Sequence, residues 1–284
     1  MVDIRDYQCD FENKWCPGCG NFGILNSMKD ALAGMGLPPE KVLIVSGIGQ
    51  AAKTPHFLKC NFFHGLHGRA LPVATGAKIA NRDLNILVNM GDGDCYGEGG
   101  NHFLSAIRRN INVTLLVHDN RVYGLTKGQA SPTSERGFET RLQPHGPRSD
   151  PMNPVALALS QGAGFVARGY VGNREQLGGL IRQGIEYSGF ALIDIMQVCV
   201  SFNRINTYEW YKQRVYDANR AGHDENDFRA AMELAFENKE KIPTGLIYRK
   251  QTIPFSDRLG RPEPGALLRE KYNPDKVQRL IGSA

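Results

Sequence analysis

The chain has 284 residues, with 34 Lys and Arg against 29 Asp and Glu, so its formal net charge is +5. This length allows one large domain with an appendage, and the sequence has no basic run interleaved with aromatic residues that would indicate nucleic-acid binding. No stretch approaches the roughly 18 apolar residues needed to span a bilayer, and no apolar leader precedes the charged N-terminus. We therefore expect a cytoplasmic protein that binds neither nucleic acid nor membrane.

Apolar periodicity predicts helices and strands that alternate along the chain. Residues 20–35 have helical spacing and end at Gly36, with Pro38 beyond, as helix stop signals require. Further helices are expected at 72–80, 100–109, 154–161, 174–187 and within 228–236, and strands at 41–45, 84–90, in the apolar run ending at Asp119, at 164–169 and at 190–198. The strands are near-continuous apolar runs, so we predict an α/β fold with a doubly wound, mainly parallel sheet.

Two regions depart from this regular alternation. Residues 128–153 are rich in Ser, Pro, Gly, Thr and Arg without periodicity, which predicts a functional lid or a surface used by a partner. The stretch 243–284 contains five prolines and many charges, so we expect an extended arm lying on this or another subunit. We accordingly divide the chain into a domain at 1–205 and a C-terminal helix and arm at 206–284.

Polar residues follow two of the expected strands at the points where these strands end. Gly91-Asp92-Gly93 follows the run 84–90, and Asn120 follows the apolar run that ends at Asp119. A right-handed crossover between parallel strands brings both ends to one edge of the sheet. Carboxylate and amide oxygens suit Mg²⁺ bridging to phosphates, and the glycines let a phosphate come close. Either segment alone would be an ordinary turn, but together they predict a metal-diphosphate site.

The cysteines suggest a second site. Cys16 and Cys19 form a C-x-x-C pair among six cysteines, in a chain expected to lie in a reducing compartment. Such a pair is compatible with half of a zinc site, half of an iron-sulfur site, a redox dithiol or chance.

The spacing from Gly-Asp-Gly to Asn resembles the thiamine diphosphate motif of transketolases, decarboxylases and 2-oxoacid dehydrogenases. A longer series of blocks resembles the β subunit of 2-oxoacid:ferredoxin oxidoreductases. The blocks are WCPGCGNFG at 15–23, VSGIG at 45–49, FHGLHGRALPVATG at 63–76, GDGD at 91–94, YGLTKGQ at 123–129, GFALID at 189–194, CVSFN at 199–203 and NTYEWYK at 206–212. The resemblance covers most of the chain. It implies thiamine diphosphate, Mg²⁺ and a [4Fe-4S] cluster as cofactors.

The resemblance also assigns residues to these cofactors. Asp92 and Asn120 would bind Mg²⁺ through their side chains, and Val122 through its carbonyl. The implied contacts with the organic cofactor are Ile48, Gly49, Gln50, Ala51, Gly65, Leu66, His67, Gly68, Arg69, Gly91, Gly93, Asp94, Gly124 and Leu125. His67 and Lys127 are the implied catalytic residues, with Lys127 at the mouth of the site, where it can meet a carboxylate or a phosphate.

The cluster ligands are matched only in part. Cys16, Cys19 and Cys199 match three of the family's cluster cysteines, but Gln50 stands where a fourth is common, and glutamine is not an expected iron ligand. Cys60 is the best replacement. Cys95 is its rival, although it should lie beside the diphosphate site. A role for Cys60 as a small buried hydrophobic residue, or an incomplete or absent cluster, is the alternative.

The implied reaction is oxidative decarboxylation of a 2-oxoacid with coenzyme A, giving an acyl-coenzyme A and CO₂, with electrons passed to ferredoxin. Some members of the family run in reverse and fix CO₂. The blocks favour 2-oxoglutarate over pyruvate, and an α subunit is required, in an α₂β₂ assembly. The mildly basic surface suits acidic ferredoxin and the phosphates of coenzyme A. A non-redox thiamine diphosphate lyase subunit and an iron-sulfur electron-transfer module are the alternatives.

Overall fold

A computed structural model describes residues 2–237, 240–259 and 271–282. Its centre is a sheet whose strands lie in the order β2-β1-β3-β4-β6-β5-β8-β7. The strands are β1 (Val42–Ser46), β2 (Asn61–His64), β3 (Asn85–Gly91), β4 (Val113–Asp119), β5 (Phe165–Tyr170), β6 (Phe190–Met196), β7 (Val215–Asp217) and β8 (Ile242–Arg249). Every neighbouring pair from β2 through β5 is parallel, whereas β8 is antiparallel to β5. The mainly parallel sheet is therefore confirmed.

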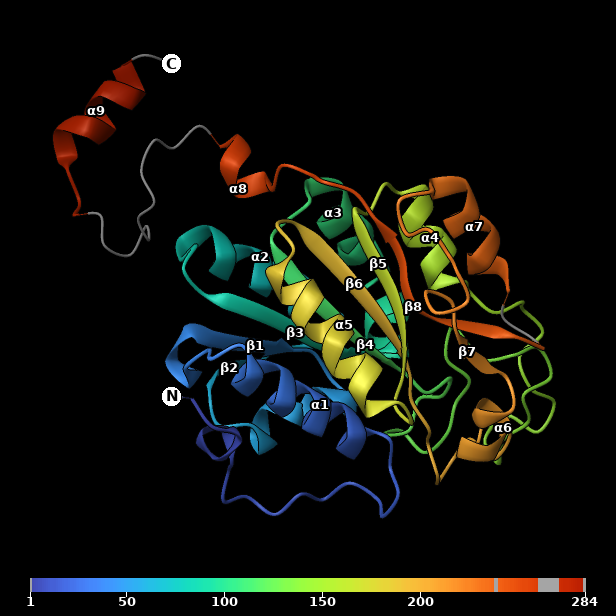
Figure 1. The fold of residues 1–284 in the computed structure, drawn as a ribbon. Helices are drawn as coiled ribbons and strands as arrows, with labels where there is room; N and C mark the ends of the chain where they lie inside the picture. The colour runs from blue at the N-terminus through green and yellow to red at the C-terminus, as the bar shows by residue number, and fades with distance from the viewer. Residues whose placement is uncertain (1, 238–239, 260–270, 283–284) are drawn as a thin grey trace.

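Helices cover both faces of this sheet (Figure 1). They are α1 (Asn21–Gly34), α2 (Ala70–Ala80), α3 (Gly100–Arg109), α4 (Pro154–Ser160), α5 (Arg174–Glu186), α6 (Tyr208–Lys212), α7 (Phe228–Phe236), α8 (Phe255–Arg258) and α9 (Pro274–Gly282). The pair α1 and α5 packs over one face, and α2, α3, α4 and α7 pack over the other. Along β3, Leu87 joins the first core and its neighbours Ile86 and Val88 join the second. Burial on both faces explains the continuous apolar strands.

Side-chain caps fix where several helices begin and end. Asn153 and Asn173 precede α4 and α5, and each accepts a hydrogen bond from a backbone N–H of the first turn. Asn110 ends α3 in the left-handed conformation, with φ of 52°, and its Oδ1 accepts from the N–H of Phe190 at 2.9 Å. The end of α3 is thereby tied to the start of β6.

The C-terminal part of the chain differs from the expectation. The segment expected to be an arm from Pro243 onward begins instead as β8, a buried strand between β5 and β7. Pro243 and Gly245 interrupt its apolar pattern, and the pairing with β5 shifts register between Val166 and Ala167, where Ile247 is the extra residue of a bulge in β8. An arm can start only after Arg249, and 260–270 and 283–284 lie outside the described residues. The division at 205/206 stays a prediction.

Two short strands were not expected. The first is the edge strand β2, which begins just before the block 63–76 and ends inside it. The second is β7, which pairs with β8 at the opposite edge of the sheet. The stretch 128–153 contains neither helix nor strand beyond a single bridge between Tyr123 and Gln129, as its composition predicted. Within the described ranges, no helix has the length and apolar character that a bilayer crossing requires.

Candidate active site at the carboxyl ends of four parallel strands

Four neighbouring strands, β1, β3, β4 and β6, end at the same edge of the sheet. The chain turns to opposite sides after β1 and β3, which makes this the switch point where open α/β sheets bind ligands. A cavity of about 80 Å³ lies there. It is lined by Ile48, Gly49, Gln50, Ala51, His67, Gly91, Asp92, Gly93, Asp94, Asn120, Val122, Tyr123, Gly124, Leu125 and Thr126. The structure thus brings together most of the residues implied as cofactor contacts.

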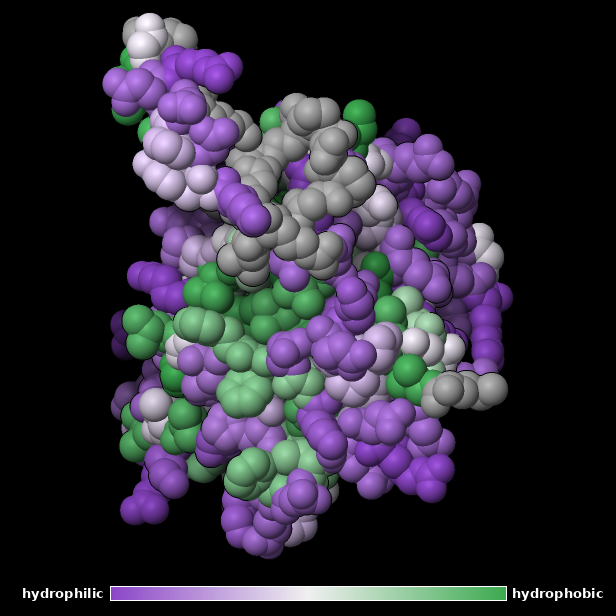
Figure 2. Space-filling view, turned by 90° about the vertical axis from the view of Figure 1, so that its left-hand side faces the viewer, coloured by the Kyte–Doolittle hydropathy of each residue, from purple (hydrophilic) through white to green (hydrophobic). Residues whose placement is uncertain are grey.

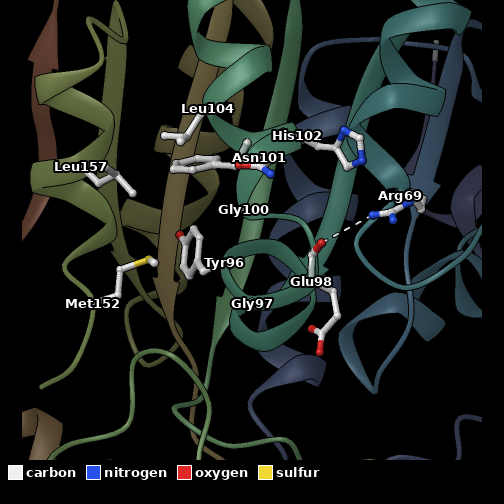
Figure 3. A pocket seen from close by; sticks show the side chains of 11 residues that line it. Arg69, Tyr96, Gly97, Glu98, Gly100, Asn101, His102, Leu104, Met152 and Leu157 are labelled. Atoms are coloured by element: carbon white, nitrogen blue, oxygen red, sulfur yellow. Dashed lines mark hydrogen bonds between the residues drawn. The ribbon is translucent and has the colours of Figure 1, made fainter. Parts of the chain in front are cut away.

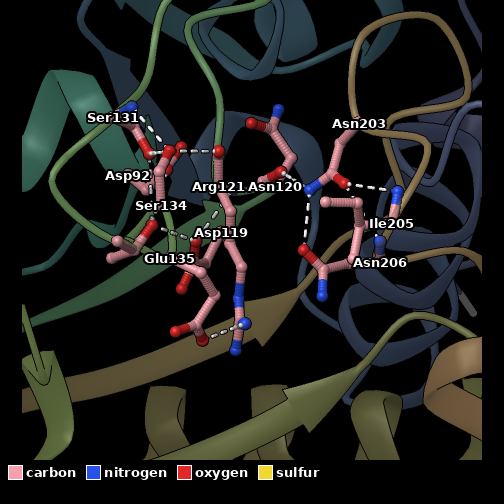
Figure 4. Close-up of polar contacts among 11 residues, drawn as sticks. Asp92, Asp119, Asn120, Arg121, Ser131, Ser134, Glu135, Asn203, Ile205 and Asn206 are labelled. Carbon is pink, nitrogen blue, oxygen red and sulfur yellow. Dashed lines mark hydrogen bonds and ion pairs between the residues drawn. The ribbon is translucent and has the colours of Figure 1, made fainter. Parts of the chain in front are cut away.

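Asp92 is buried in this edge, with 2% of its surface exposed. Its Oδ2 accepts a hydrogen bond from Thr133 Oγ1 at 2.8 Å, and the same hydroxyl lies 2.7 Å from Asp119 Oδ1 (Figure 4). A hydroxyl has one proton, so it can satisfy only one of the two carboxylates at a time. Burial, and then the charge of Asp119, raises the pKa of Asp92 to about 8. A divalent cation at Asp92 would relieve this repulsion, so the donor set fits Mg²⁺.

The loop after β4 presents the other two expected metal ligands. Asn120 and Val122 line the cavity, and Asn120 Oδ1 accepts from the N–H of Val122 at 3.0 Å. Between them Arg121 has φ of 59°, a left-handed conformation that reverses the chain direction. The Nδ2 of Asn203 donates to the carbonyl of Asn120 at 3.1 Å, so the loop is held from the segment after β6.

Gly93 has a role that differs from the expected one. A Cβ added to Gly93 would lie 2.2 Å from the Tyr123 ring, so this position makes room for a tyrosine. The hydroxyl of Tyr123 in turn lies 3.1 Å from Glu98 Oε2. At Gly91 the nearest atom to an added Cβ is the methyl of Ala51 at 3.9 Å, an ordinary contact. The glycine pattern is therefore explained in part by packing within the protein.

Asp94 ties together the two loops that flank the cavity. Its Oδ1 accepts from the N–H of Gly68 at 2.7 Å and from the N–H of Ile48 at 3.2 Å, and it lies 2.8 Å from Nδ1 of His67. A Cβ added to Gly47 would lie 2.1 Å from Oδ2 of Asp94, so the loop after β1 can come this close to Asp94 only with glycine at this position. As the acceptor facing Nδ1, the Asp94 carboxylate raises the pKa of His67. This shift favours the protonated, positively charged imidazole of His67 at the cavity wall.

The rest of the 63–76 block lies around the edge of the cavity. His64 braces the loop, with Nδ1 3.0 Å from Ser46 Oγ and 2.9 Å from the carbonyl of Ala52, and the N–H of Gly65 donates to the carbonyl of Ser46. Leu66 is 74% exposed. Arg69 lines a second cavity of about 460 Å³ together with Tyr96, Glu98, His102 and Met152 (Figure 3).

Lys127 stands in a strained turn beyond the cavity lining. Its backbone φ is 83°, a value that residues other than glycine rarely adopt. The turn is closed by hydrogen bonds from the N–H of Lys127 to the carbonyl of Gly124 at 3.2 Å and from the N–H of Gly128 to the carbonyl of Tyr123 at 2.9 Å. This geometry holds Lys127 exposed next to Thr126, the last residue of the lining.

Three of the expected cluster cysteines converge near the same edge. Cys16 and Cys19 precede α1, and the N–H of Gly20 donates to the carbonyl of Val198, which brings them to Cys199. Ser201 Oγ donates to the Cys16 sulfur at 3.1 Å. Burial, and to a lesser extent the neighbouring Cys199 and Cys16, raises the pKa of Cys19 to about 11.

Cys60 does not join these three cysteines. It precedes β2 and is four residues before His64, which pairs with the last residue of β1. Four strand residues span about 13 Å, so Cys60 lies toward the opposite end of the sheet, where its sulfur contacts the carbonyl of Asn61 at 3.3 Å. In the described ranges, no three Cys, His, Asp or Glu side chains are arranged to hold a metal ion. That criterion concerns a site for one metal ion: a single zinc ion, for example, would need its sulfur ligands roughly 3.8 Å apart. A cluster binds each cysteine through a different iron, so its cysteines need not lie as close together.

Several residues of the site were not anticipated from the sequence. Thr133 and Ser134 come from the irregular stretch 128–153, where Ser134 Oγ donates to the carbonyl of Arg121. Tyr123 and Asn203 lay inside blocks that carried the resemblance, but nothing in their spacing distinguished them from other loop residues. Their roles depend on contacts between segments far apart in the sequence.

Comparison with known proteins agrees with this geometry. The family model of the thiamine pyrophosphate enzyme, C-terminal TPP binding domain, matches residues 45–195, so fold and cavity define a thiamine diphosphate-binding protein. A second family model, which describes the C-terminal part of the β chain of pyruvate ferredoxin oxidoreductase, matches 199–263.

Relatives along the full chain identify the family. The β subunit of 2-oxoacid:ferredoxin oxidoreductase from a Sulfolobus species is 43% identical over 277 residues, covering 93% of this chain and 90% of that one. The 2-oxoglutarate oxidoreductase subunit KorB of Mycobacterium tuberculosis is 46% identical over 199 residues, covering 70% and 53%. A 2-oxoglutarate:ferredoxin oxidoreductase structure from Magnetococcus marinus, with 2-oxoglutarate, coenzyme A and succinyl-CoA bound, superposes with a TM-score of 0.90 at 38% identity, covering 99% and 96%. This chain belongs to the β subunits of 2-oxoacid:ferredoxin oxidoreductases.

Proposed function

We propose that this chain, with an α subunit, oxidatively decarboxylates 2-oxoglutarate in the presence of coenzyme A and passes two electrons to ferredoxin, and that the reaction can run in reverse to fix CO₂. The products are succinyl-coenzyme A and CO₂. The observation that carries the proposal is the cavity at the β1/β3 switch point with the buried Asp92 on its wall. The Magnetococcus protein and the KorB relatives favour 2-oxoglutarate over pyruvate.

The chain's own residues would bind and orient the cofactor. Thiamine diphosphate supplies a nucleophilic carbon that adds to the 2-oxo group and stores the electrons released on decarboxylation. Asp92, the Asn120 side chain and the Val122 carbonyl would hold Mg²⁺ at its diphosphate. His67, whose pKa is raised by Asp94, would stand beside the same negative charge. Lys127 would meet an anionic group of the substrate or of coenzyme A at the mouth.

The iron-sulfur cluster and the electron acceptor belong to the proposal as well. Cys16, Cys19 and Cys199 would hold a cluster beside the cofactor cavity, because a Cβ on Gly124 in the cavity wall would lie only 4.0 Å from the Cys199 sulfur. Electrons released in the cavity would have a short path to it, and from there to ferredoxin. All six cysteines are free thiols, which suits the reducing cytoplasm where we place the enzyme.

An α subunit would cover the apolar edge of the sheet beside the site. The edge strand β2 exposes Phe62 and Phe63 by 54% and 50%, and Leu66, next to His67, by 74%. Figure 2 faces this side of the molecule and shows apolar residues gathered across its middle. An exposed apolar edge strand next to a ligand site is typical of a partner interface. We propose an α₂β₂ assembly that closes the cofactor site from this edge.

The test is anaerobic co-purification of both subunits followed by viologen reduction with a panel of 2-oxoacids. We expect turnover with 2-oxoglutarate and coenzyme A, at least about tenfold above pyruvate, because a site that pairs a second carboxylate discriminates against an analogue that lacks it. Asp92→Ala should abolish turnover, whereas Asp224→Ala, at an exposed position, should leave it unchanged. Equal turnover of wild type and Asp92→Ala would refute the proposal.

A further inference from the structure

The chain offers three thiols, not four, at the proposed cluster position. All six cysteines lie in the described part of the sequence. Cys16, Cys19 and Cys199 converge through the hydrogen bonds from the Gly20 N–H to the Val198 carbonyl and from Ser201 to the Cys16 sulfur, whereas Cys60 lies toward the far end of β2. Cys9 points its sulfur at the carbonyl of His56. Cys95 is fully buried in the core beneath the diphosphate site. A cluster with four thiolates therefore does not fit this arrangement.

Gln50 is a polar residue near the C-x-x-C segment and on the wall of the cavity that Cys199 abuts. Trp15, the neighbour of Cys16, donates from Nε1 to the carbonyl of Gln50 at 2.9 Å, which holds Gln50 close to the C-x-x-C segment. Gln50 also lines the cavity whose wall at Gly124 abuts Cys199. Its Oε1 is buried, and among the described residues it has no hydrogen-bond partner. A buried amide oxygen without a partner is costly unless something binds it.

We propose that Cys16, Cys19 and Cys199 bind three irons of the cluster and that the fourth iron has no thiolate and faces the amide oxygen of Gln50. The inference rests on the iron-sulfur cluster of the proposed function. Iron in such clusters prefers thiolate to a neutral amide oxygen, so this iron is the one most easily lost. In the loss step, [4Fe-4S]²⁺ gives up one electron to an added oxidant such as ferricyanide and releases one Fe²⁺, leaving [3Fe-4S]⁺.

The test uses the complete α and β complex, purified without oxygen and titrated with ferricyanide. Electron paramagnetic resonance measures the [3Fe-4S]⁺ signal, and Mössbauer spectroscopy counts the irons that remain. In the wild type we expect the signal to rise toward one spin per cluster, with release of one Fe²⁺. Gln50→Cys supplies the missing thiolate and should lower the signal about tenfold. Gln50→Ala should lose iron at least as readily as the wild type.

Cys60→Ser is the matched control for the fourth ligand. It should leave the titration unchanged, because Cys60 lies far from the other three thiols; a lower iron content in this variant would overturn the proposal. A wild-type cluster as resistant to oxidant as that of Gln50→Cys would overturn it as well, with the proposed function intact. A wild-type complex that binds thiamine diphosphate but carries no iron would instead refute the cluster in the proposed function, and with it this inference.

Discussion

We expect Asp92 to have opposite effects on stability and on cofactor binding. Without a cation, its carboxylate is buried beside Asp119, and the two share one hydroxyl of Thr133. We therefore predict that Asp92→Asn stabilises the cofactor-free complex while it abolishes binding of Mg²⁺ and thiamine diphosphate. Such an exchange of stability for function is common where a binding site keeps an unpaired charge.

The size of the effect follows from the pKa of Asp92. A shift from 3.8 to about 8 means that at pH 7 the folded state is disfavoured by about 4 kcal/mol relative to an unperturbed carboxyl group. An asparagine in the same place must also be desolvated, so we expect about half of this, about 2 kcal/mol. That corresponds to an increase in Tm of about 4 °C.

The pH dependence has a defined sign. Between about pH 4 and pH 8 the folded state holds a proton on Asp92 that the unfolded chain has lost, so the stability of the cofactor-free wild type falls as pH rises. Asp92→Asn should make this slope smaller.

The assay is thermal unfolding of the stripped complex from pH 5 to pH 8, with and without Mg²⁺ and thiamine diphosphate. Asp224→Asn, at an exposed site, is the control and should change Tm little. A lower Tm for cofactor-free Asp92→Asn at pH 8, or a full cofactor-induced rise in its Tm, would refute the reasoning.

Two further substitutions test the walls of the cavity. Gly93→Ala places a Cβ 2.2 Å from the Tyr123 ring and should destabilise the fold by about 2 kcal/mol in denaturant titrations. Gly100→Ala is the control and should be neutral, because an added Cβ there has nothing within 4 Å. Asp94→Asn keeps the shape of the side chain but removes the charge that raises the pKa of His67, so nuclear magnetic resonance of labelled histidine should show this pKa falling. An unchanged value would count against the influence of Asp94 on His67.

Much of the fold follows from local patterns. The spacing at 20–35 and the continuous apolar runs at 84–90 and 190–198 each correspond to one observed element, because burial on both faces of a parallel sheet leaves a strong pattern. The strand β8 was missed because Pro243 and Gly245 suit a loop by local preference, and only pairing with β5 and β7 makes a strand there. Tertiary context overrode local preference.

The candidate site was predictable where it depends on strand ends. The approach of Asp92 and Asn120 follows from the topology of parallel strands alone. The contributions of Thr133 and Asn203 could not be derived, because each depends on a loop returning from a distant part of the chain. Cys60 illustrates the same limit, since its distance along the chain gave no indication that it lies toward the other end of the sheet.

The central claim is that the ends of β3 and β4 jointly hold a divalent ion together with a diphosphate. Its most direct test replaces Mg²⁺ with Mn²⁺ in the complete complex and follows bound Mn²⁺ by electron paramagnetic resonance during titration with thiamine diphosphate. We predict that Mn²⁺ becomes bound in step with the cofactor, with a phosphorus hyperfine coupling, and that Asp92→Ala and Asn120→Ala lose this signal. Full Mn²⁺ binding with the same coupling in both variants would contradict the account.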